Sequence, residues 1–472
     1  MTSHSSHGGN KYIYLLQEFS IPLLLGVVVA IVIANANPKL YDTLVHHTYA
    51  VFTGETVDDH DSHDDHDSHD DHDSHGEHGD DQHADEAAHE NDGDNSSQLL
   101  EAGHGGDHHN DWRHFLTLHF VINELFMVLF FGIAAKEITE SFLPGGALNP
   151  PSKAVNPLLG TLGGVFGPVG VYILLNLVIG DGSYPWSTGE GNWGRGWGIP
   201  TATDIALAWL VARMVFGTGH PAISFLLLLA VADDGIGLFI IAFFYPTQDP
   251  VWLNTIWVVP GVITAVLLRK LNVKSWLPYV LVGGAFSWWG LFSAHLHPAL
   301  ALVPIVPLLP GPKRDEGLFR DDPHTIETDP LNKFEHDLKA FVDFGLFFFA
   351  FANAGVQFSS LNNLTWVVFL SLLIGKTLGI SLFSWAGVKA GFPMPTGMGM
   401  RHLIVAGIVA GLGLTVALFV AGQAFSDLDL QGSAKMGALF SGGIAFIAII
   451  VGRALGVKDG AGHPVATDDT EA

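Results

Sequence analysis

Long apolar stretches separated by short polar connections make up most of the 472-residue chain. Twelve such runs can be distinguished, and runs of this length and composition are typical of membrane-spanning helices. They cover residues 14–36, 115–140, 155–180, 200–216, 221–245, 251–270, 276–293, 295–310, 338–358, 363–390, 401–422 and 433–455. The pattern therefore predicts an all-α polytopic membrane protein with twelve transmembrane helices.

The composition agrees with this prediction. Hydrophobic residues form 48% of the chain and charged residues 14%, which is too apolar for an ordinary soluble protein of this size. The first run could also be a cleaved signal peptide, because Ala34-Asn35-Ala36 imitates a cleavage site. We favour a retained helix, since one lysine, Lys11, precedes the run and the run exceeds the usual length of a signal-peptide core.

The distribution of Lys and Arg sets the orientation of the predicted helices. With the N-terminus in the cytoplasm, sixteen of the 21 basic residues fall on the inner side, and Lys376 falls within a helix. The outer side receives Lys39, Arg113, Arg195 and Lys435. This bias follows the positive-inside rule. It predicts cytoplasmic ends at 1–13 and 456–472, and a transmembrane domain over 14–455 that is interrupted by an extracytoplasmic loop at 52–110.

One polar segment within that loop has its own composition. Seventeen Asp and Glu residues lie between Asp58 and Asp94, so the segment carries most of the formal net charge of −26. The sequence HDSHDD repeats with a six-residue period, and the lack of apolar side chains predicts disorder. Weak transition-metal binding is one interpretation, but we favour a solvated linker that concentrates cations, because a flexible tract has no fixed coordination geometry. The candidate ligands are His60, His63, His66, His69, His72 and His75.

Three carboxylates lie inside neighbouring apolar runs, at Asp204, Asp233 and Asp234. A charged side chain at the centre of a bilayer costs about 2.5 to 3.5 kcal/mol on an insertion scale, so such residues usually mark an ion path. Successive helical residues point about 100° apart, so Asp233 and Asp234 are expected to have different partners. Lys376, within SLLIGKTLGISLF, is the natural candidate for a fixed positive charge beside one of them.

The blocks PTATDIALA, LAVADDGIGLFIIAFFY, FAFANAGV, LLIGKTLGISLF and GIVAGLGLTVALFVA occur in this order along the chain. Together they resemble the NhaA family of sodium/proton antiporters over nearly the whole hydrophobic part of the sequence. The resemblance implies inverted three-helix repeats, with broken helices 4 and 11 that cross at the membrane midplane. Helix-breaking residues occur in both runs, at Pro200 before Thr203-Asp204 and in the stretch from Gly411 to Thr415.

The resemblance also implies roles for the charged residues. Asp234 would be the principal sodium ligand, with Thr203 and Asp233 nearby, and Asp233 would pair with Lys376. Half-helix ends carry partial charges, which Asp204 and Lys376 would compensate at the crossing. For Asp204 we favour this electrostatic role alone.

Further family positions point to ion access or a response to pH. They correspond to Glu124, Glu137, His297, Glu335 and His336. The chain departs from the family pattern where Glu124 replaces an aspartate, Ser141 replaces a second acid and Lys339 replaces a second histidine. For His297 we favour a hydrogen-bonded structural group over a ligand, and for Glu137 a hydrated helix end is an equal alternative.

The function implied by the resemblance is exchange of cytoplasmic sodium or lithium for external protons in a bacterial inner membrane. This exchange would be electrogenic and would serve pH and sodium homeostasis. A homodimer is also implied, although the acidic tract replaces the segment through which the family partly dimerises. We expect no cofactor and no nucleic-acid partner.

Three other functions are alternatives to antiport of sodium. A divalent-metal/proton exchanger fed by the His/Asp tract is the main alternative. A non-transporting sensor would have no reason to keep costly buried charges. An enzyme is disfavoured, because no nucleophile with its base and no cofactor loop appears in the sequence. The absence of cysteine excludes disulfides and thiolate metal sites.

Deletion of residues 58–95 separates the two transport hypotheses. If the tract is a linker, sodium-dependent proton flux in proteoliposomes will persist after the deletion. A metal carrier would instead lose affinity for zinc. Loss of sodium exchange by a correctly folded deletion variant would contradict the linker interpretation.

Overall fold

The computed structural model describes residues 20–46, 117–146, 148–149, 151–185, 191–312 and 329–457. All of them belong to one compact unit, and all of their regular elements are helices. The His/Asp-rich tract with its six candidate histidines, the N-terminal residues 1–13 and all but the first two residues of the predicted C-terminal tail lie outside the described residues.

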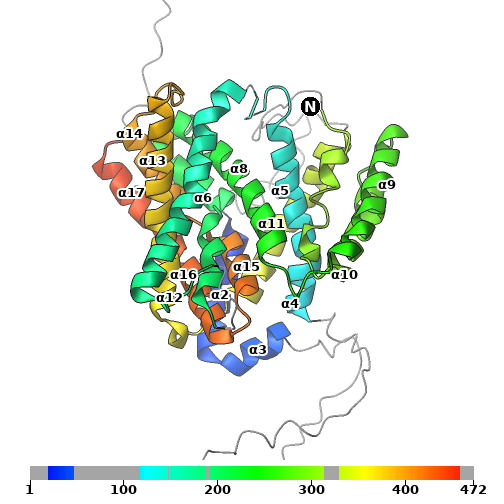
Figure 1. Cartoon of the computed structure of the whole chain (residues 1–472), viewed down its shortest axis with the longest axis horizontal. Coiled ribbons are helices and arrows are strands. Elements are labelled where there is room, and N and C mark those ends of the chain that lie inside the picture. The colour runs from blue at the N-terminus through cyan, green and yellow to red at the C-terminus, as the bar shows by residue number, and fades with distance from the viewer. Residues whose placement is uncertain are drawn as a thin grey trace, which may run out of the picture. The chain divides into compact units, whose positions relative to one another are not determined.

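The helices follow the apolar runs in chain order (Figure 1). They are α2 (Ile21–Ala36), α3 (Pro38–His46), α4 (Leu118–Phe120), η3 (Val121–Phe126), α5 (Met127–Ser141), α6 (Pro151–Ile179), η4 (Trp193–Thr201), α7 (Ile205–Phe216), α8 (Pro221–Phe244), η5 (Trp252–Trp257), α9 (Val258–Lys270), η6 (Tyr279–Gly283), α10 (Gly284–Ser293), η7 (Pro298–Leu300), η8 (Val306–Leu308), α11 (Pro330–Asn353), η9 (Phe358–Ser360), α12 (Asn363–Leu370), η10 (Ser371–Gly375), α13 (Lys376–Lys389), α14 (Met400–Ala410), α15 (Leu414–Ala424), α16 (Leu428–Phe440), η11 (Ser441–Gly443) and α17 (Ile444–Ala454).

Six continuous helices in the described residues are long and apolar enough to cross a membrane. They are Leu118–Ser141, Ala154–Ile179, Pro221–Phe244, Trp252–Lys270, Asn363–Lys389 and Leu428–Ala454. Two further pairs pass the same criteria together but are bent, η4 with α7 by 53° and α14 with α15 by 47°. The prediction of an all-α membrane protein is thus confirmed, and up to eight of the predicted crossings are long and apolar enough to span a membrane.

One predicted helix has a different conformation. Residues 295–310 form turns and the short 3-10 helices η7 and η8 instead of a continuous α-helix. Pro298, Pro304, Pro307 and Pro310 lie in this segment, and each of them lacks the backbone N–H that an α-helix requires beyond its first turn. The segment is nevertheless packed inside the protein, since residues such as Leu302 are fully buried.

Both predicted helix breaks are confirmed. Residues 202–204 separate η4 from α7, and residues 411–413 separate α14 from α15. The two breaks contact each other directly, because the backbone N–H of Asp204 donates to the Leu412 carbonyl at 2.6 Å. A Cβ on Gly411 would lie 2.8 Å from the Leu372 carbonyl oxygen, so glycine permits the close approach of the η10 backbone at this point.

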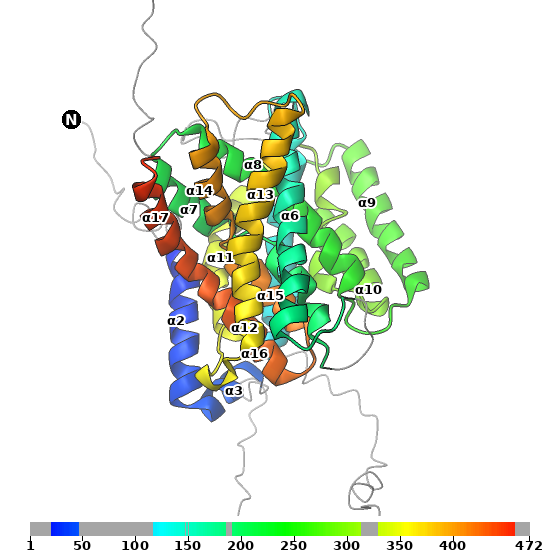
Figure 2. The same cartoon turned by 60° about the vertical axis from the view of Figure 1, so that its left-hand side comes forward.

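The longest helix, α6, packs tightly along α13, and the two run side by side in both views (Figures 1 and 2). Glycines allow this approach, because a Cβ on Gly163 would lie 2.1 Å from the Gly379 carbonyl oxygen and a Cβ on Gly379 would lie 2.0 Å from that of Gly163. Small residues at such positions let the backbones of membrane helices come into contact. Since α13 begins with Lys376, this packing fixes the position of the backbone from which the Lys376 side chain extends.

Substitution of Gly163 by alanine will therefore destabilise the helix pair. We expect Gly163→Ala to cost about 1 to 3 kcal/mol through overpacking, measured as a lower unfolding temperature in detergent. The control is Gly170→Ala on the same helix, where nothing lies within 4 Å of the added Cβ. Equal unfolding temperatures for the two variants would contradict the packing account.

Candidate functional site

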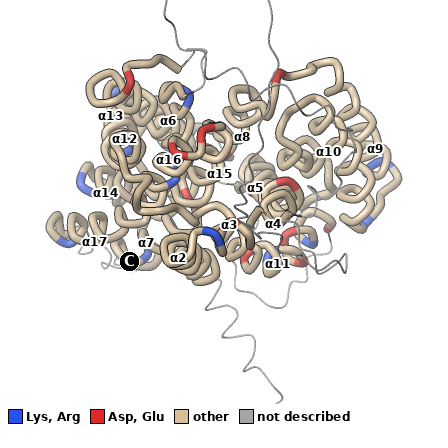
Figure 3. Tube along the Cα trace, turned by 90° about the horizontal axis from the view of Figure 1, so that it is seen from below, with Lys and Arg blue, Asp and Glu red and all other residues tan. Residues whose placement is uncertain are grey.

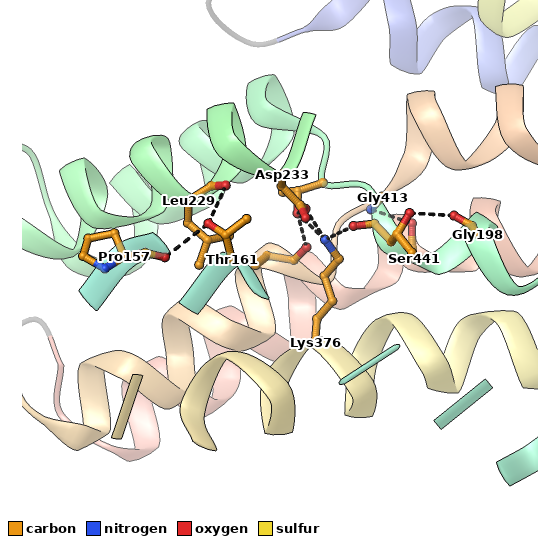
Figure 4. A network of polar contacts seen from close by, with 11 residues as sticks. Pro157, Thr161, Gly198, Leu229, Asp233, Lys376, Gly413 and Ser441 are labelled. Carbon is orange, nitrogen blue, oxygen red and sulfur yellow. Dashed lines mark hydrogen bonds and ion pairs between the residues drawn. The ribbon is translucent and has the colours of Figure 1, made fainter. Parts of the chain in front are cut away.

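The broken helices, α8 and α13 bring three polar side chains to one place in the interior. Thr203 lies in the break before α7, Asp233 lies in the middle of α8, and Lys376 is the first residue of α13. Figure 4 shows the Lys376 side chain reaching from its helix toward Asp233. Their juxtaposition could not follow from sequence spacing, because the three residues come from separate segments of the chain.

Asp233 and Lys376 form an ion pair that is closed to solvent. Lys376 is 0% exposed and Asp233 is 1% exposed, and Lys376 Nζ donates to Asp233 Oδ2. Lys376 Nζ also donates to the Thr201 carbonyl and to Thr203 Oγ1, both at 2.7 Å. All three donor positions of the ammonium are therefore occupied, as a buried charge requires.

Thr203 links this ion pair to both breaks. Its Oγ1 lies 2.8 Å from Asp233 Oδ2 and 3.0 Å from the Ala410 carbonyl oxygen. The single hydroxyl proton serves one of these acceptors at a time. A change at the carboxylate of Asp233 is thus coupled to the end of α14 through one hydroxyl group.

Asp234 has a different environment from its neighbour. It lines a small cavity together with Phe130, Phe131, Ala134, Leu238, Ile241 and Val416. Its buried Oδ1 has no hydrogen-bond partner among the described residues, and neither does Oδ1 of Asp233. An unpaired buried carboxylate oxygen is energetically costly. The two adjacent aspartates therefore have different surroundings, since Asp233 is paired with Lys376 and Asp234 lines a cavity.

Asp204 lies between two helix N-termini. Its Oδ1 accepts from the Leu207 N–H of α7 at 3.1 Å. Its Oδ2 accepts from the Thr415 hydroxyl at 3.0 Å and from the Thr415 N–H of α15 at 3.3 Å. A carboxylate at a helix N-terminus offsets the partial positive charge there, while Lys376 binds the carbonyl end of η4. This geometry fits the compensating role expected for Asp204 and Lys376.

A second buried charge cluster joins α5 to α11. Lys136 is 3% exposed; its Nζ donates to Glu140 Oε2 at 2.5 Å and to Glu335 Oε2. Glu137 interacts electrostatically with both Lys136 and Glu335. Of the predicted residues here, Glu335 and Glu137 are thus brought together, whereas the side chain of His336 is 90% exposed and lies 3.4 Å from Asp337. Lys136 lies near the end of the apolar run 115–140, where hydropathy alone does not distinguish a buried charge from a hydrated one.

Other predicted residues lie apart from the ion pair. One buried oxygen of Glu124, Oε2, has no partner among the described residues, and the adjacent Asn123 accepts from Asn353 Nδ2 at 2.9 Å. The ring of His297 is fully buried and its Nε2 is hydrogen-bonded to the Tyr245 carbonyl. The structure therefore gives His297 the hydrogen bond that we expected of a structural histidine.

Lys435 was also missed as a buried residue. The positive-inside count assigned it to the outer side, but it lies in α16 with 8% exposure and donates to Gln431 Oε1 at 3.0 Å. Lys435 is the third residue of the apolar run 433–455, and this position within the run could have indicated that it is buried. Seen from below, acidic and basic segments lie among α8, α15 and α16, in the interior of the group of helices (Figure 3).

Taken together, spanning helices, two broken helices in contact and charged groups inside them define an integral membrane protein of the ion-transporter class. The family model described as Na+/H+ antiporter 1 matches residues 98–454, and the chain belongs to this family. It is 51% identical to the Na(+)/H(+) antiporter NhaA of Geobacter metallireducens over 95% of this chain and 99% of that protein. The corresponding values for Geobacter sulfurreducens are 51%, 95% and 99%, and those for Desulfitobacterium hafniense are 49%, 95% and 97%.

A double-mutant cycle tests whether Asp233 and Lys376 act as one electrostatic unit. Asp233→Asn and Lys376→Met each leave one buried partner alone, and breaking a buried pair typically costs about 3 to 5 kcal/mol. The double variant removes both charges, so we expect it to unfold at a higher temperature than either single variant. Additive losses in the three variants would show that the pair contributes no coupling.

Proposed function

We propose that this protein exchanges sodium ions for protons across the bacterial inner membrane, with Asp234 as the group at which the two cations compete. Family membership and the antiporter names of its close relatives support this exchange. The single observation that carries the assignment to Asp234 is its cavity-lining position with an unpartnered, buried carboxylate oxygen.

The chemistry of the site accounts for competition. An isolated negative charge in a low-dielectric interior must be neutralised, and either a proton or a cation can do this. Sodium is a hard cation that prefers oxygen ligands, and the free oxygens of Asp234 and Asp233 supply them. A proton on Asp234 removes the charge that attracts sodium, so loading of one ion releases the other.

Alternating exposure of this group to the two sides would turn competition into transport. Sodium would bind Asp234 from the cytoplasm after the proton has left, and protonation from outside would release it. The contact between the two breaks is the natural place for a rearrangement, because Thr203 and Asp204 connect both half-helix pairs there. Lithium, a smaller hard cation, would be accepted by the same oxygens.

Asp233 and Lys376 supply a reason for electrogenic transport. If the ion pair opens when sodium binds and its proton is also exchanged, more than one proton moves per sodium ion. The two aspartates would then titrate as a coupled system. Such exchange would couple the pH of the cytoplasm to its sodium content.

The membrane arrangement that we propose has twelve crossings with both termini in the cytoplasm. The six continuous spans and two bent pairs supply eight. The remaining four would be α2, η6 with α10, the irregular segment 295–310, and α11. Inverted three-helix repeats, midplane crossing of the broken helices and a homodimer complete the arrangement implied by the family.

No observation on the described residues favours exchange of divalent metals. No group of three or more His, Cys, Asp or Glu residues in this part of the chain is placed to hold a metal ion. The His/Asp-rich tract lies outside it, and the deletion of residues 58–95 remains the test of that alternative.

Replacement of Asp234 tests the proposed function. Asp234→Asn keeps the size of the side chain but removes the charge for which proton and sodium compete, so sodium-dependent proton flux in proteoliposomes should fall to the level of empty vesicles. Asp249→Asn, which changes an exposed carboxylate after α8, is the matched control and should retain flux. Full exchange by a folded Asp234→Asn protein would refute the assignment.

A further inference from the structure

Two histidine rings contact each other where α3 and α4 meet, at the lower end of Figure 1. His46 is the last residue of α3, and His119 is the middle residue of α4. The centroids of their rings are 5.4 Å apart, with a tilt of 35°. The side chain of His46 is 53% exposed, so solutes can reach the pair. The fold thus brings two imidazoles from separate helices together at an accessible position.

The helix that carries His46 is anchored to the rest of the protein. On α3, Tyr41 is 8% exposed and Val45 is 0% exposed. The hydroxyl of Tyr41 donates to the Phe351 carbonyl at 2.7 Å and accepts from the Gly355 N–H at 3.1 Å. Because His46 directly follows Val45, the backbone that carries its ring has a fixed position.

His119 is held at the start of a spanning helix. The side chain of Thr117 caps α4, since its Oγ1 accepts from the Phe120 N–H at 3.2 Å. Phe120 is 9% exposed, and α4 continues through η3 into α5 as one span, Leu118–Ser141. A pair of ligands on two helices that are already fixed needs little rearrangement when it binds a ligand.

A carboxylate determines which nitrogen of the His46 ring carries the proton. Nδ1 of His46 lies 2.9 Å from Oδ1 of Asp42, one helical turn earlier. An ionised carboxylate can only accept a hydrogen bond, so Nδ1 donates to it and Nε2 of the neutral ring keeps its lone pair. Histidines that bind metals commonly have this arrangement, in which a carboxylate orients the ring through the nitrogen that is not coordinated.

The separation of the two rings suits a single metal ion. With zinc–nitrogen bonds of about 2.0 to 2.1 Å and a tetrahedral angle, the centroids of two imidazoles on one zinc ion lie about 5 Å apart. The observed separation of 5.4 Å is close to this value. We propose that His46 and His119 bind one divalent transition-metal ion such as zinc, with Nε2 of His46 as one ligand atom and Asp42 as the positioning residue.

The donor atoms select the kind of ion. Imidazole binds zinc, copper and nickel, whereas magnesium and calcium prefer oxygen ligands. Among the described residues, no third His, Cys, Asp or Glu completes a metal-binding group with the two rings. Water therefore takes the remaining positions of a four-coordinate ion.

A metal ion at this place joins two helices and is not carried across the membrane. α3 follows α2, and α4 begins the next span, so the site is on the outer side in the arrangement that we propose. Asp234, the proposed exchange group, lies on a different helix, α8. The metal site therefore does not depend on which ions are exchanged at Asp234.

The unfolding temperature of the purified full-length protein in detergent tests for an ion that bridges α3 and α4. Such an ion binds only the folded protein and stabilises it, whereas metal bound equally by the folded and unfolded chain gives no stabilisation. Zinc should raise the midpoint of unfolding by about 2 °C or more relative to EDTA. Magnesium at the same concentration should give no comparable rise, and a wild-type midpoint that zinc leaves unchanged would overturn the proposal.

Two variants each remove one ligand and retain a side chain that favours a helix, His46→Gln and His119→Gln. Each should lose the zinc-dependent rise in the midpoint. His336→Gln is the matched control, because His336 is a 90% exposed histidine on α11 that also has a carboxylate neighbour, Asp337. It should keep the full rise. All three variants retain the histidines of the His/Asp-rich tract, so a full rise in either ligand variant would refute the site.

Replacement of Asp42 tests its role as the positioning residue. Asp42→Ala removes the partner of His46 Nδ1 but neither ligand, so about 10 to 100 times more zinc should be needed for half of the rise. The midpoint in EDTA separates this effect from any loss of stability that is unrelated to zinc. An unchanged zinc requirement would show that Asp42 does not position the ring.

Anomalous diffraction at the zinc absorption edge would locate the ion directly. Crystals of the full-length protein soaked in zinc should show a peak about 2.0 to 2.1 Å from Nε2 of His46, between the two rings. Crystals of His119→Gln should show none there. Ordered rings without a peak between them would contradict the site. Absence of sodium-dependent proton flux, with this peak present, would refute the proposed function and leave the metal site supported.

Discussion

The buried ion pair between Lys376 and Asp233 is the interaction on which the rest of the site depends. It occupies the ammonium completely, through Asp233, Thr203 and the Thr201 carbonyl. This lysine is engaged with Asp233, whereas the adjacent Asp234 lines the cavity and has a buried carboxylate oxygen without a hydrogen-bond partner among the described residues. Adjacency on one helix thus places two carboxylates in unlike surroundings, and we propose that the second exchanges its neutralising cation.

The broken helices serve this arrangement by bringing ends of helices, instead of their sides, to the interior. Helix ends offer unpaired N–H and carbonyl groups with partial charges. The carboxylate of Asp204 accepts hydrogen bonds from N–H groups at the beginnings of α7 and α15. Lys376 and Thr203 donate to the carbonyl groups that end η4 and α14. Such a junction can change its hydrogen bonds without unwinding a continuous helix.

Much of this could be predicted from the sequence, for identifiable reasons. Pro200, Gly411 and Gly413 predict both breaks, because proline and glycine disfavour a continuous helix. The buried charges are also visible in the sequence, because few charged residues lie deep in its apolar runs: these are Asp204, Asp233, Asp234 and Lys376. Lys136 and Lys435 were not recognised as buried, because hydropathy alone does not distinguish a buried charge near a helix end from a hydrated one. The four prolines of 298–310 indicate an irregular segment, whereas the apolar composition of the same residues predicts a continuous helix.

Calorimetry of sodium binding to the purified protein shows whether a proton and sodium compete for one carboxylate. Titrations in buffers with different ionisation enthalpies report how many protons leave as sodium binds, by the same linkage that couples metal binding to deprotonation of its ligands. If the two cations compete at Asp234, sodium binding will release at least one proton and will weaken as the pH falls, and Asp234→Asn will abolish it. Sodium binding that is independent of pH and releases no proton would contradict this competition.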